Sequence, residues 1–180
     1  RWQDYGTTDG MSNYRVNTIA IDDAGLKWVG TRSRLNVLDD KGDPFDKLDG
    51  DEWVIFELAD GLPYVTIRDI TIDEAGHKWL GTYNSSSQLG ALSVLDDLGT
   101  PLDKTDDVWE SFTTTDGLEH AEIYSLMLPG GDQVWIGTRT GLNALDHGGT
   151  PTDKGDDQWQ RFTSEDGLVE ANVLAIAQDE

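Results

Sequence analysis

The sequence predicts an all-β chain that forms part of a β-propeller, and three observations carry this prediction. A unit of about fifty residues is present three times in full and begins a fourth time, over residues 2–52, 53–108, 109–158 and 159–180. Each full unit has room for four short strands. Seven Trp and twenty Gly in 180 residues favour many strands joined by tight turns over a helical bundle. Repeated four-stranded antiparallel units are typical of propeller blades.

Tryptophan and glycine set the register of the repeat. Each copy opens with a tryptophan that is followed eight residues later by the glycine of an Asp-Gly step: Trp2, Trp53, Trp109 and Trp159. These tryptophans are 51, 56 and 50 residues apart. The long middle copy contains extra residues in the polar, Ser-rich stretch 83–90, which we expect to be a surface loop.

Within one copy, the opening Trp strand leads through the Asp-Gly turn to an apolar strand, such as residues 67–72. A glycine turn leads to a Trp-apolar-Gly-Thr strand, and a last short strand follows, such as residues 142–145. One blade takes its three inner strands from one copy and its outermost strand from the next copy. We therefore expect about three complete blades with one further strand at each end. We expect the second tryptophan of each copy to be buried between blades: Trp28, Trp79 and Trp135.

Open strand edges invite pairing, so the expected partner at the two ends is the remainder of a longer chain or another copy of this chain. The formal net charge of −22 argues against nucleic acid and anionic membranes, which both require clustered Lys and Arg. No segment of the sequence is long and apolar enough to insert into a membrane. The absence of Cys excludes a disulfide framework and thiolate metal sites.

Residues 19–31, Ile-Ala-Ile-Asp-Asp-Ala-Gly-Leu-Lys-Trp-Val-Gly-Thr, resemble the two-component regulator propeller repeat. Residues 70–82 resemble it as well, and residues 126–138 do so less closely, because Pro129 and Asp132 replace the Asp and the Gly. The resemblance implies a larger, usually seven-bladed propeller in an extracellular, periplasmic or cell-surface location, often the sensor portion of a hybrid histidine kinase. No part of this chain resembles a kinase core or a response regulator.

Loops rich in aspartate precede the Trp strands of the second, third and fourth copies. Closely spaced carboxylates repel one another unless they are protonated, solvated or bridged by a cation. Ca²⁺ suits such loops because it accepts six to eight oxygen ligands in flexible geometry. The predicted ligands are Asp40, Asp43, Asp46, Asp49, Asp97, Asp103, Asp106, Asp107, Asp153, Asp156 and Asp157. One lysine in each loop leaves an alternative, in which solvent and local Asp–Lys pairs neutralise the carboxylates: Lys47, Lys104 and Lys154.

The sequence contains no arrangement of nucleophile, acid and base that predicts catalysis. A propeller lyase would need a convergent acid and base, and His120 and Glu122 are the residues with which to test that alternative.

Binding is the better prediction. The loops before each innermost strand and after each Trp-apolar-Gly-Thr strand share one face, where residues differ among the copies. The predicted binding residues are Arg15, Arg32, Arg34, Arg68, Tyr83, Glu122, Tyr124 and Arg139. Arginine and aromatic side chains suit a glycan or a peptide. The leading prediction is a non-catalytic extracellular ligand-binding or sensor propeller, and a structural repeat of a cell-surface or filament assembly is the alternative.

Overall fold

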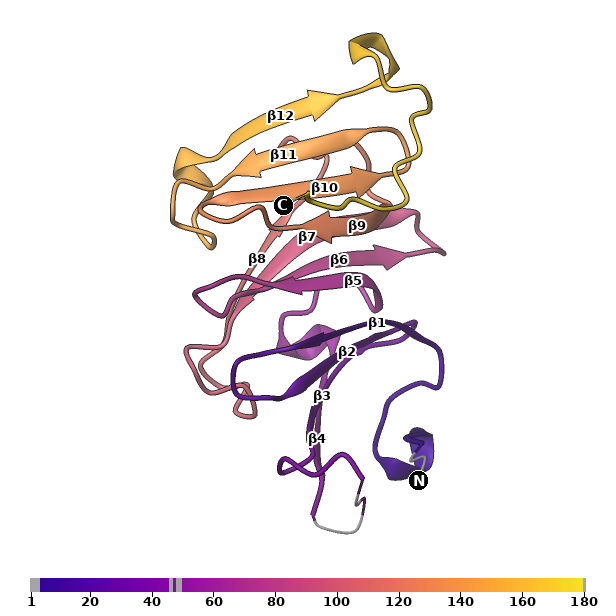
Figure 1. Cartoon of the computed structure of the whole chain (residues 1–180), viewed down its shortest axis with the longest axis vertical. Helices are drawn as coiled ribbons and strands as arrows, with labels where there is room; N and C mark the ends of the chain where they lie inside the picture. The colour runs from indigo at the N-terminus through magenta and orange to yellow at the C-terminus, as the bar shows by residue number, and fades with distance from the viewer. Residues whose placement is uncertain (1–3, 46, 48–49, 180) are drawn as a thin grey trace.

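The computed structural model describes residues 4–45, 47 and 50–179, which form three four-stranded antiparallel sheets (Figure 1). Blade one contains β1 (Val16–Ile21), β2 (Lys27–Thr31), β3 (Leu35–Asp39) and β4 (Glu52–Phe56). Blade two contains β5 (Thr66–Ile72), β6 (Lys78–Asn84), β7 (Leu89–Asp96) and β8 (Val108–Phe112). Blade three contains β9 (Ile123–Met127), β10 (Gln133–Thr138), β11 (Leu142–Asp146) and β12 (Gln158–Phe162). The predicted fold class, propeller blades in an all-β chain, is confirmed.

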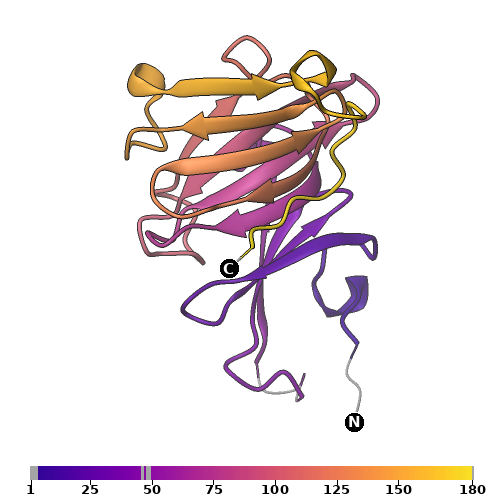
Figure 2. The same cartoon turned by 45° about the horizontal axis from the view of Figure 1, so that its top comes forward.

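The strands of each blade pair in sequence order, because each antiparallel neighbour follows through a short turn or loop. The three blades lie side by side, with β5 between β1 and β9, and the sheets do not close into a ring (Figures 1 and 2). The elements that are not strands include short 3₁₀ turns at Thr7–Asp9, Leu58–Asp60, Lys154–Asp156 and Ser164–Asp166. Within the described part of the chain, no helix has the length and apolar character needed to cross a bilayer.

The connections divide between two faces at opposite ends of the strands. We call one the arginine face; it carries the connections 6–15, 57–65, 113–122 and 163–172 and the turns 32–34, 85–88 and 139–141. We call the other the aspartate face; it carries the turns 22–26, 73–77 and 128–132 and the loops 40–51, 97–107 and 147–157. The six described arginines lie at or next to strand ends on the arginine face: Arg15, Arg32, Arg34, Arg68, Arg139 and Arg161. The six lysines belong to strand ends or loops of the aspartate face: Lys27, Lys41, Lys47, Lys78, Lys104 and Lys154.

Tryptophan fills the space between neighbouring blades. Trp28 and Trp79 are fully buried, and each stacks on an aromatic ring of its own blade, Phe56 or Phe112, with centroids 5.9 and 6.2 Å apart. Their indole N–H groups donate to Asp22 at 2.8 Å and to Asp73 at 3.0 Å, which satisfies the polar atom of each buried ring.

The burial expected for Trp135 is wrong. This side chain stacks on Phe162 but stays half-buried, because no described blade covers its outer side. Pro129 also stands where Asp22 and Asp73 accept the indole hydrogen bond in the other two blades.

The glycine of each Trp-apolar-Gly-Thr strand lets the next innermost strand approach. A Cβ at Gly30 would lie 2.7 Å from Ile67, and one at Gly81 would lie 2.8 Å from Ile123. A Cβ at Gly137 would likewise lie 3.0 Å from the side chain of Val173. The C-terminal residues therefore pack on blade three where a further innermost strand would lie.

The unpaired strand expected at each end is not formed by the described residues. Val173 donates its N–H to Thr138 at 3.0 Å, but residues 168–179 hold no strand because the described chain offers no neighbour for a ladder. Residues 4–15 hold no strand either, although Tyr5 packs on Trp53 as Phe56 packs on Trp109. Trp2 lies outside the described residues.

Residues 83–90 extend a hairpin and only partly form the surface loop that the composition suggests. Tyr83 pairs with Gly90 and Asn84 with Leu89, so only residues 85–88 form the turn. Tyr83 is buried, and Gly90 approaches so closely that an added Cβ would lie 2.2 Å from the carbonyl oxygen of Ala121. The insertion therefore extends the β6–β7 hairpin along the arginine face toward blade three.

Candidate functional site

Arg68 is the centre of a side-chain cluster where blades two and three meet on the arginine face. Its Nη2 lies 2.6 Å from Oε1 of Glu122, which is only 8% exposed. Its guanidinium carbon lies 5.3 Å from the ring centre of Tyr83 and 5.8 Å from that of Tyr124. The cation therefore compensates the buried carboxylate and contacts two aromatic faces.

Arg139 extends this cluster outward, because its Nη1 lies 3.5 Å from Oε2 of Glu122. Burial and the negative charge of Glu122 raise the pKa of Tyr124, against the opposing charges of Arg139 and Arg68. The Nε of Arg68 is buried without a hydrogen-bond partner among the described residues. Ion pairs and ring contacts therefore hold the cluster in place, and the Nε–H of Arg68 is left as a donor without a partner among the described residues.

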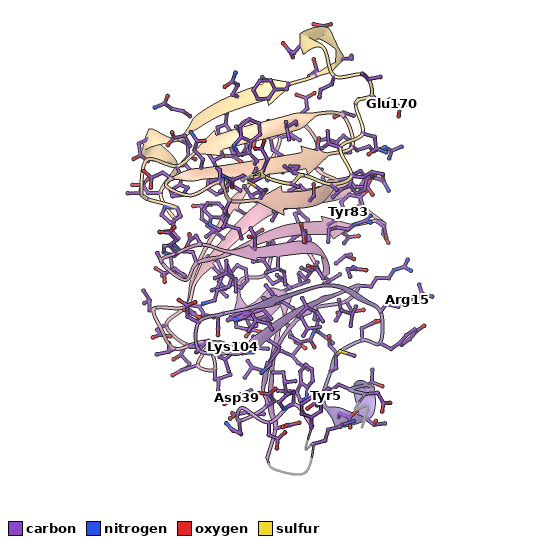
Figure 3. The ribbon with its side chains drawn as sticks, viewed as in Figure 1. Tyr5, Arg15, Asp39, Tyr83, Lys104 and Glu170 are labelled. Atoms are coloured by element: carbon purple, nitrogen blue, oxygen red, sulfur yellow. The ribbon has the colours of Figure 1, made fainter. Side chains whose placement is uncertain are left out.

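A hollow of about 340 Å³ lies between blades one and two, on the side of Arg68 that faces blade one. Its lining consists of Arg15, Asn17, Arg32, Thr66, Arg68, Tyr83 and Ser85. An adjoining hollow of about 490 Å³ shares Arg15, Arg32, Thr66 and Ser85 and adds Asn13, Tyr14, Ser33, Val65, Asn84 and Ser86. We call the two together the arginine hollow. Arg15 and Tyr83 lie on the same side of the molecule, opposite Asp39 and Lys104 (Figure 3).

Seven of the eight binding residues predicted from the sequence lie in the arginine hollow or in the Arg68 cluster beside it. Arg34 is the exception, because it lines neither part of the hollow. Its Nε lies 3.0 Å from Oε1 of Glu57. Sequence reasoning missed Asn13, Tyr14, Ser33, Val65, Ser85 and Ser86 as lining residues. A signal for the two serines was available in the insertion, which only the second copy has.

The pair named for a lyase, His120 and Glu122, is held in structural contacts. Nδ1 of His120 accepts the backbone N–H of Glu122 at 2.9 Å, so this nitrogen is not available as a base. The carboxylate of Glu122 lies between the two arginines described above. Nδ1 of His120 and the carboxylate of Glu122 therefore both have structural partners.

One contact recurs in every copy and joins an Asp-rich loop of the aspartate face to a connection assigned to the arginine face. The loop lysine reaches the aspartate of the preceding Asp-Gly turn, as in Lys104–Asp60 at 2.8 Å and Lys154–Asp116 at 3.1 Å. Each lysine also donates to a backbone carbonyl of the preceding outer strand, Ile55 at 2.9 Å or Ser111 at 2.6 Å. Lys47 makes the matching contacts with Asp9, at 2.9 Å, and with the carbonyl oxygen of Asp4.

Lys104 and Lys154 therefore join neighbouring blades, and the loop carboxylates that do pair with lysine, Asp40 and Asp97, use Lys27 and Lys78 instead. The loop folds back so that each ammonium lies over an aromatic ring of the preceding outer strand, 5.7 Å from Phe56 for Lys104 and 5.2 Å from Phe112 for Lys154. The negative partners belong to the Asp-Gly turn and, for Lys154, also to the outer strand, where Oε1 of Glu110 lies 3.2 Å from its Nζ.

The predicted metal ligands occupy three kinds of place. Asp40 and Asp97 are buried and form ion pairs with Lys27, at 2.6 Å, and with Lys78. Turn groups of their own loops donate hydrogen bonds to the carboxylates of Asp43, Asp103, Asp106, Asp153 and Asp156. Asp46 and Asp49 lie outside the described residues. Among the residues that the structure describes, no three acidic or histidine side chains form a metal-binding group.

Asp107 and Asp157, like Asp51 at the same place in the first loop, contain buried oxygens without hydrogen-bond partners among the described residues. Burial, followed by the negative charges of Asp97 and Asp106, raises the pKa of Asp107 to about 6. Burial and the charge of Asp156 likewise raise the pKa of Asp157 to about 6. Asp107 and Asp157 are therefore positions in the loops where a cation or a proton would relieve an uncompensated charge.

No protein-family model and no curated protein matches this sequence. Solved structures do match its fold. The extracellular domain assigned to the hybrid two component system BT3049 of B. thetaiotaomicron gives a TM-score of 0.69 at 17% identity, over 95% of this chain and 20% of that chain. PorZ, a surface component of the type-IX secretion system of Porphyromonas gingivalis, gives 0.61 at 19% identity, over 85% and 21%.

The extracellular domain of BT4673 of B. thetaiotaomicron gives a TM-score of 0.60 at 20% identity, over 88% of this chain and 18% of that one. The chain therefore spans about a fifth of the length of the structures it matches. At these identities the likeness shows the fold: the chain has the architecture of a segment of these extracellular domains.

Proposed function

We propose that this chain is part of an extracellular, non-catalytic propeller of the two-component regulator type that binds a glycan or peptide on its arginine face. The single observation that carries the proposal is the arginine hollow. Blades one and two bring Arg15, Arg32, Arg68 and Tyr83 to one hollow, although these residues are as many as 68 positions apart in the sequence. A concave site with a few convergent polar groups is the usual form of a ligand site.

Two further observations support the proposal. The lining residues are not repeated from blade to blade, whereas the residues that pack the blades are, so the lining is free to serve recognition. The structures of similar fold are described as extracellular domains or as a surface component, which supports an extracellular or periplasmic location.

The experiment that tests the proposal is a thermal-shift screen of the purified chain against neutral oligosaccharides, acidic oligosaccharides and short peptides. We expect at least one of these probes to raise Tm and the Ser85→Trp variant to lose that response, because Ser85 is exposed and lines both parts of the hollow. Thr114→Trp, at an exposed position of the same face outside the hollow, is the matched control. A screen without any response would contradict the proposal and favour the structural-repeat alternative.

We also infer that Ca²⁺ stabilises the aspartate face through Asp107, with Asp97 and Asp106 beside it. The support is the pair of buried, unpartnered oxygens of Asp107 and the charges of its two neighbours. Calcium binding would remove the cost of these charges, since it needs oxygen ligands and tolerates irregular geometry. We expect 1 mM Ca²⁺ to raise Tm relative to EDTA and Asp107→Asn to remove the difference. Identical melting curves in Ca²⁺ and EDTA would reject calcium.

A further inference from the structure

We propose that Arg15 and Arg32 form an oxyanion subsite in the arginine hollow, which takes the carboxylate of an acidic sugar. This inference deepens the binding function proposed above and rests on it. Its starting point is a difference among the arginines of one face, which share their location but not their partners.

Four of the six described arginines have a carboxylate partner: Arg34 with Glu57, Arg68 and Arg139 with Glu122, and Arg161 with Glu119. Arg15 and Arg32 form no ion pair within the described residues. Both side chains are exposed to solvent, in a chain with 35 acidic and 13 basic residues. The two free guanidinium groups are therefore a specific feature of this hollow.

The backbone holds the two arginines at neighbouring positions. The N–H of Arg32 donates to the carbonyl oxygen of Arg15 at 3.0 Å, and the hydroxyl of Thr66 donates to the carbonyl oxygen of Arg32 at 2.9 Å. The N–H of Arg15 donates to the Asn13 side chain at 2.8 Å. Two like charges that line one hollow repel each other, and a bridging anion turns that repulsion into attraction.

Guanidinium groups bind carboxylates through two parallel N–H donors, which makes them the preferred side chains for a planar oxyanion. The walls around them suit the rest of a sugar. Tyr14 is 72% exposed, lines the hollow and lies 5.7 Å from the guanidinium carbon of Arg15, so its ring offers a flat apolar surface. Hydroxyl and amide groups of Asn13, Ser33, Asn84, Ser85 and Ser86 line the same hollow and match a ligand rich in hydroxyls.

Because the chain has a net negative charge, an acidic ligand needs local positive charge in order to bind. An acidic ligand would be repelled by a surface of net charge −22 unless local cations attract it. Binding of an acidic sugar must therefore depend on these arginines and on ionic strength, whereas binding of a neutral sugar need not.

Titration calorimetry with trigalacturonate and its methyl ester tests the inference, because the two probes differ mainly in charge. We expect the acid to bind at least tenfold more tightly than the ester in 50 mM NaCl and to lose this advantage in 500 mM NaCl. Arg15→Ala and Arg32→Ala should each weaken binding of the acid at least tenfold and leave Tm unchanged. Arg161→Ala, which removes the same charge elsewhere on the face, should leave binding unchanged.

Equal affinity for the acid and the ester, or full binding by both arginine variants, would overturn the inference. Equal or tighter binding of a triglutamate peptide would overturn the assignment to a sugar. If a neutral oligosaccharide binds and Ser85→Trp abolishes it while Arg15→Ala does not, the proposed function holds and this inference fails. If no probe in the wider screen binds, both fail.

Discussion

The two faces of the blades use charged side chains in opposite ways. Each Asp-rich loop of the aspartate face repeats one contact, in which its lysine binds the aspartate of the Asp-Gly turn at the start of the same copy. On the arginine face the lining differs in every blade, and Arg15 and Arg32 are left without ion pairs among the described residues. The difference teaches that the repeated lysine contacts hold neighbouring blades together, whereas the unrepeated arginines without ion pairs are available for recognition.

The largest expected effect is the loss of stability on removing a tryptophan that packs between neighbouring blades. Trp79→Ala should lower the free energy of unfolding by about 3–5 kcal/mol, because it empties a fully buried position between blades two and three. Trp135→Ala should cost clearly less, because Trp135 is half-buried. Urea unfolding followed by circular dichroism measures both. Equal losses would show that the two positions are equally packed, against the structure.

Next in size is the loss of a repeated lysine contact. Lys104→Ala removes charged hydrogen bonds to Asp60 and to the carbonyl oxygen of Ile55, and should cost about 1–3 kcal/mol. Lys41→Ala is the matched control, because Lys41 pairs with Asp39 and Glu52 at an exposed site and such pairs contribute about 0–1 kcal/mol. The same unfolding experiment compares them. A Lys104 variant as stable as the Lys41 variant would show that the contact of Lys104 with Asp60 does not stabilise the packing of neighbouring blades.

A smaller effect should appear in the dependence of stability on pH. Asp107 and Asp157 have pKa values raised to about 6, so the folded chain binds more protons than the unfolded chain between about pH 4 and 6. Their contribution to stability therefore rises as the pH falls through this window in the absence of Ca²⁺. Asp107→Asn should reduce the increase in stability as the pH falls, and measuring Tm of both proteins from pH 7 to 4.5 tests this. A variant with the wild-type slope would mean that Asp107 is not the titrating group.

Below that pH window the effect of pH on stability reverses, so that a further fall in pH lowers the stability of the folded chain. Burial alone would raise the pKa of Asp60 and of Asp116, but hydrogen bonds from the Glu57 and Thr113 N–H groups and from the loop lysines lower both pKa values. The stability that these carboxylates contribute is present above pH 4 and is lost as the pH falls through their lowered pKa values. Tm should therefore pass through a maximum between about pH 4 and 5.

The blades could be predicted from the sequence because their packing requires the same residue at the same place in every copy. Gly61, at a φ of 103°, shows why: an added Cβ would lie 2.5 Å from Trp109, so the Asp-Gly step and the next Trp must recur together. The grouping of Arg15, Arg32 and Arg68 on one face could also be predicted, because strand direction alone decides it. Such features depend on periodicity, and periodicity is visible in one sequence.

Other features depend on contacts between blades that no periodicity reveals. Lys104 and Asp60 are 44 residues apart in the sequence. Their contact depends on how a loop folds back over the preceding outer strand. The place of Ser85 beside Arg15 depends on how far the β6–β7 hairpin extends. The exposed side of Trp135 depends on which blade lies next to it.

The most direct test of the difference between the two faces is one comparison of two double variants, Lys104→Ala with Lys154→Ala and Arg15→Ala with Arg32→Ala. Each removes two positive charges, and both are measured for Tm and for binding of trigalacturonate. The lysine variant should lose several degrees of Tm and keep its affinity once folded, whereas the arginine variant should keep its Tm and lose binding. A lower Tm for the arginine variant, together with an unchanged Tm for the lysine variant, would contradict this division of the two faces.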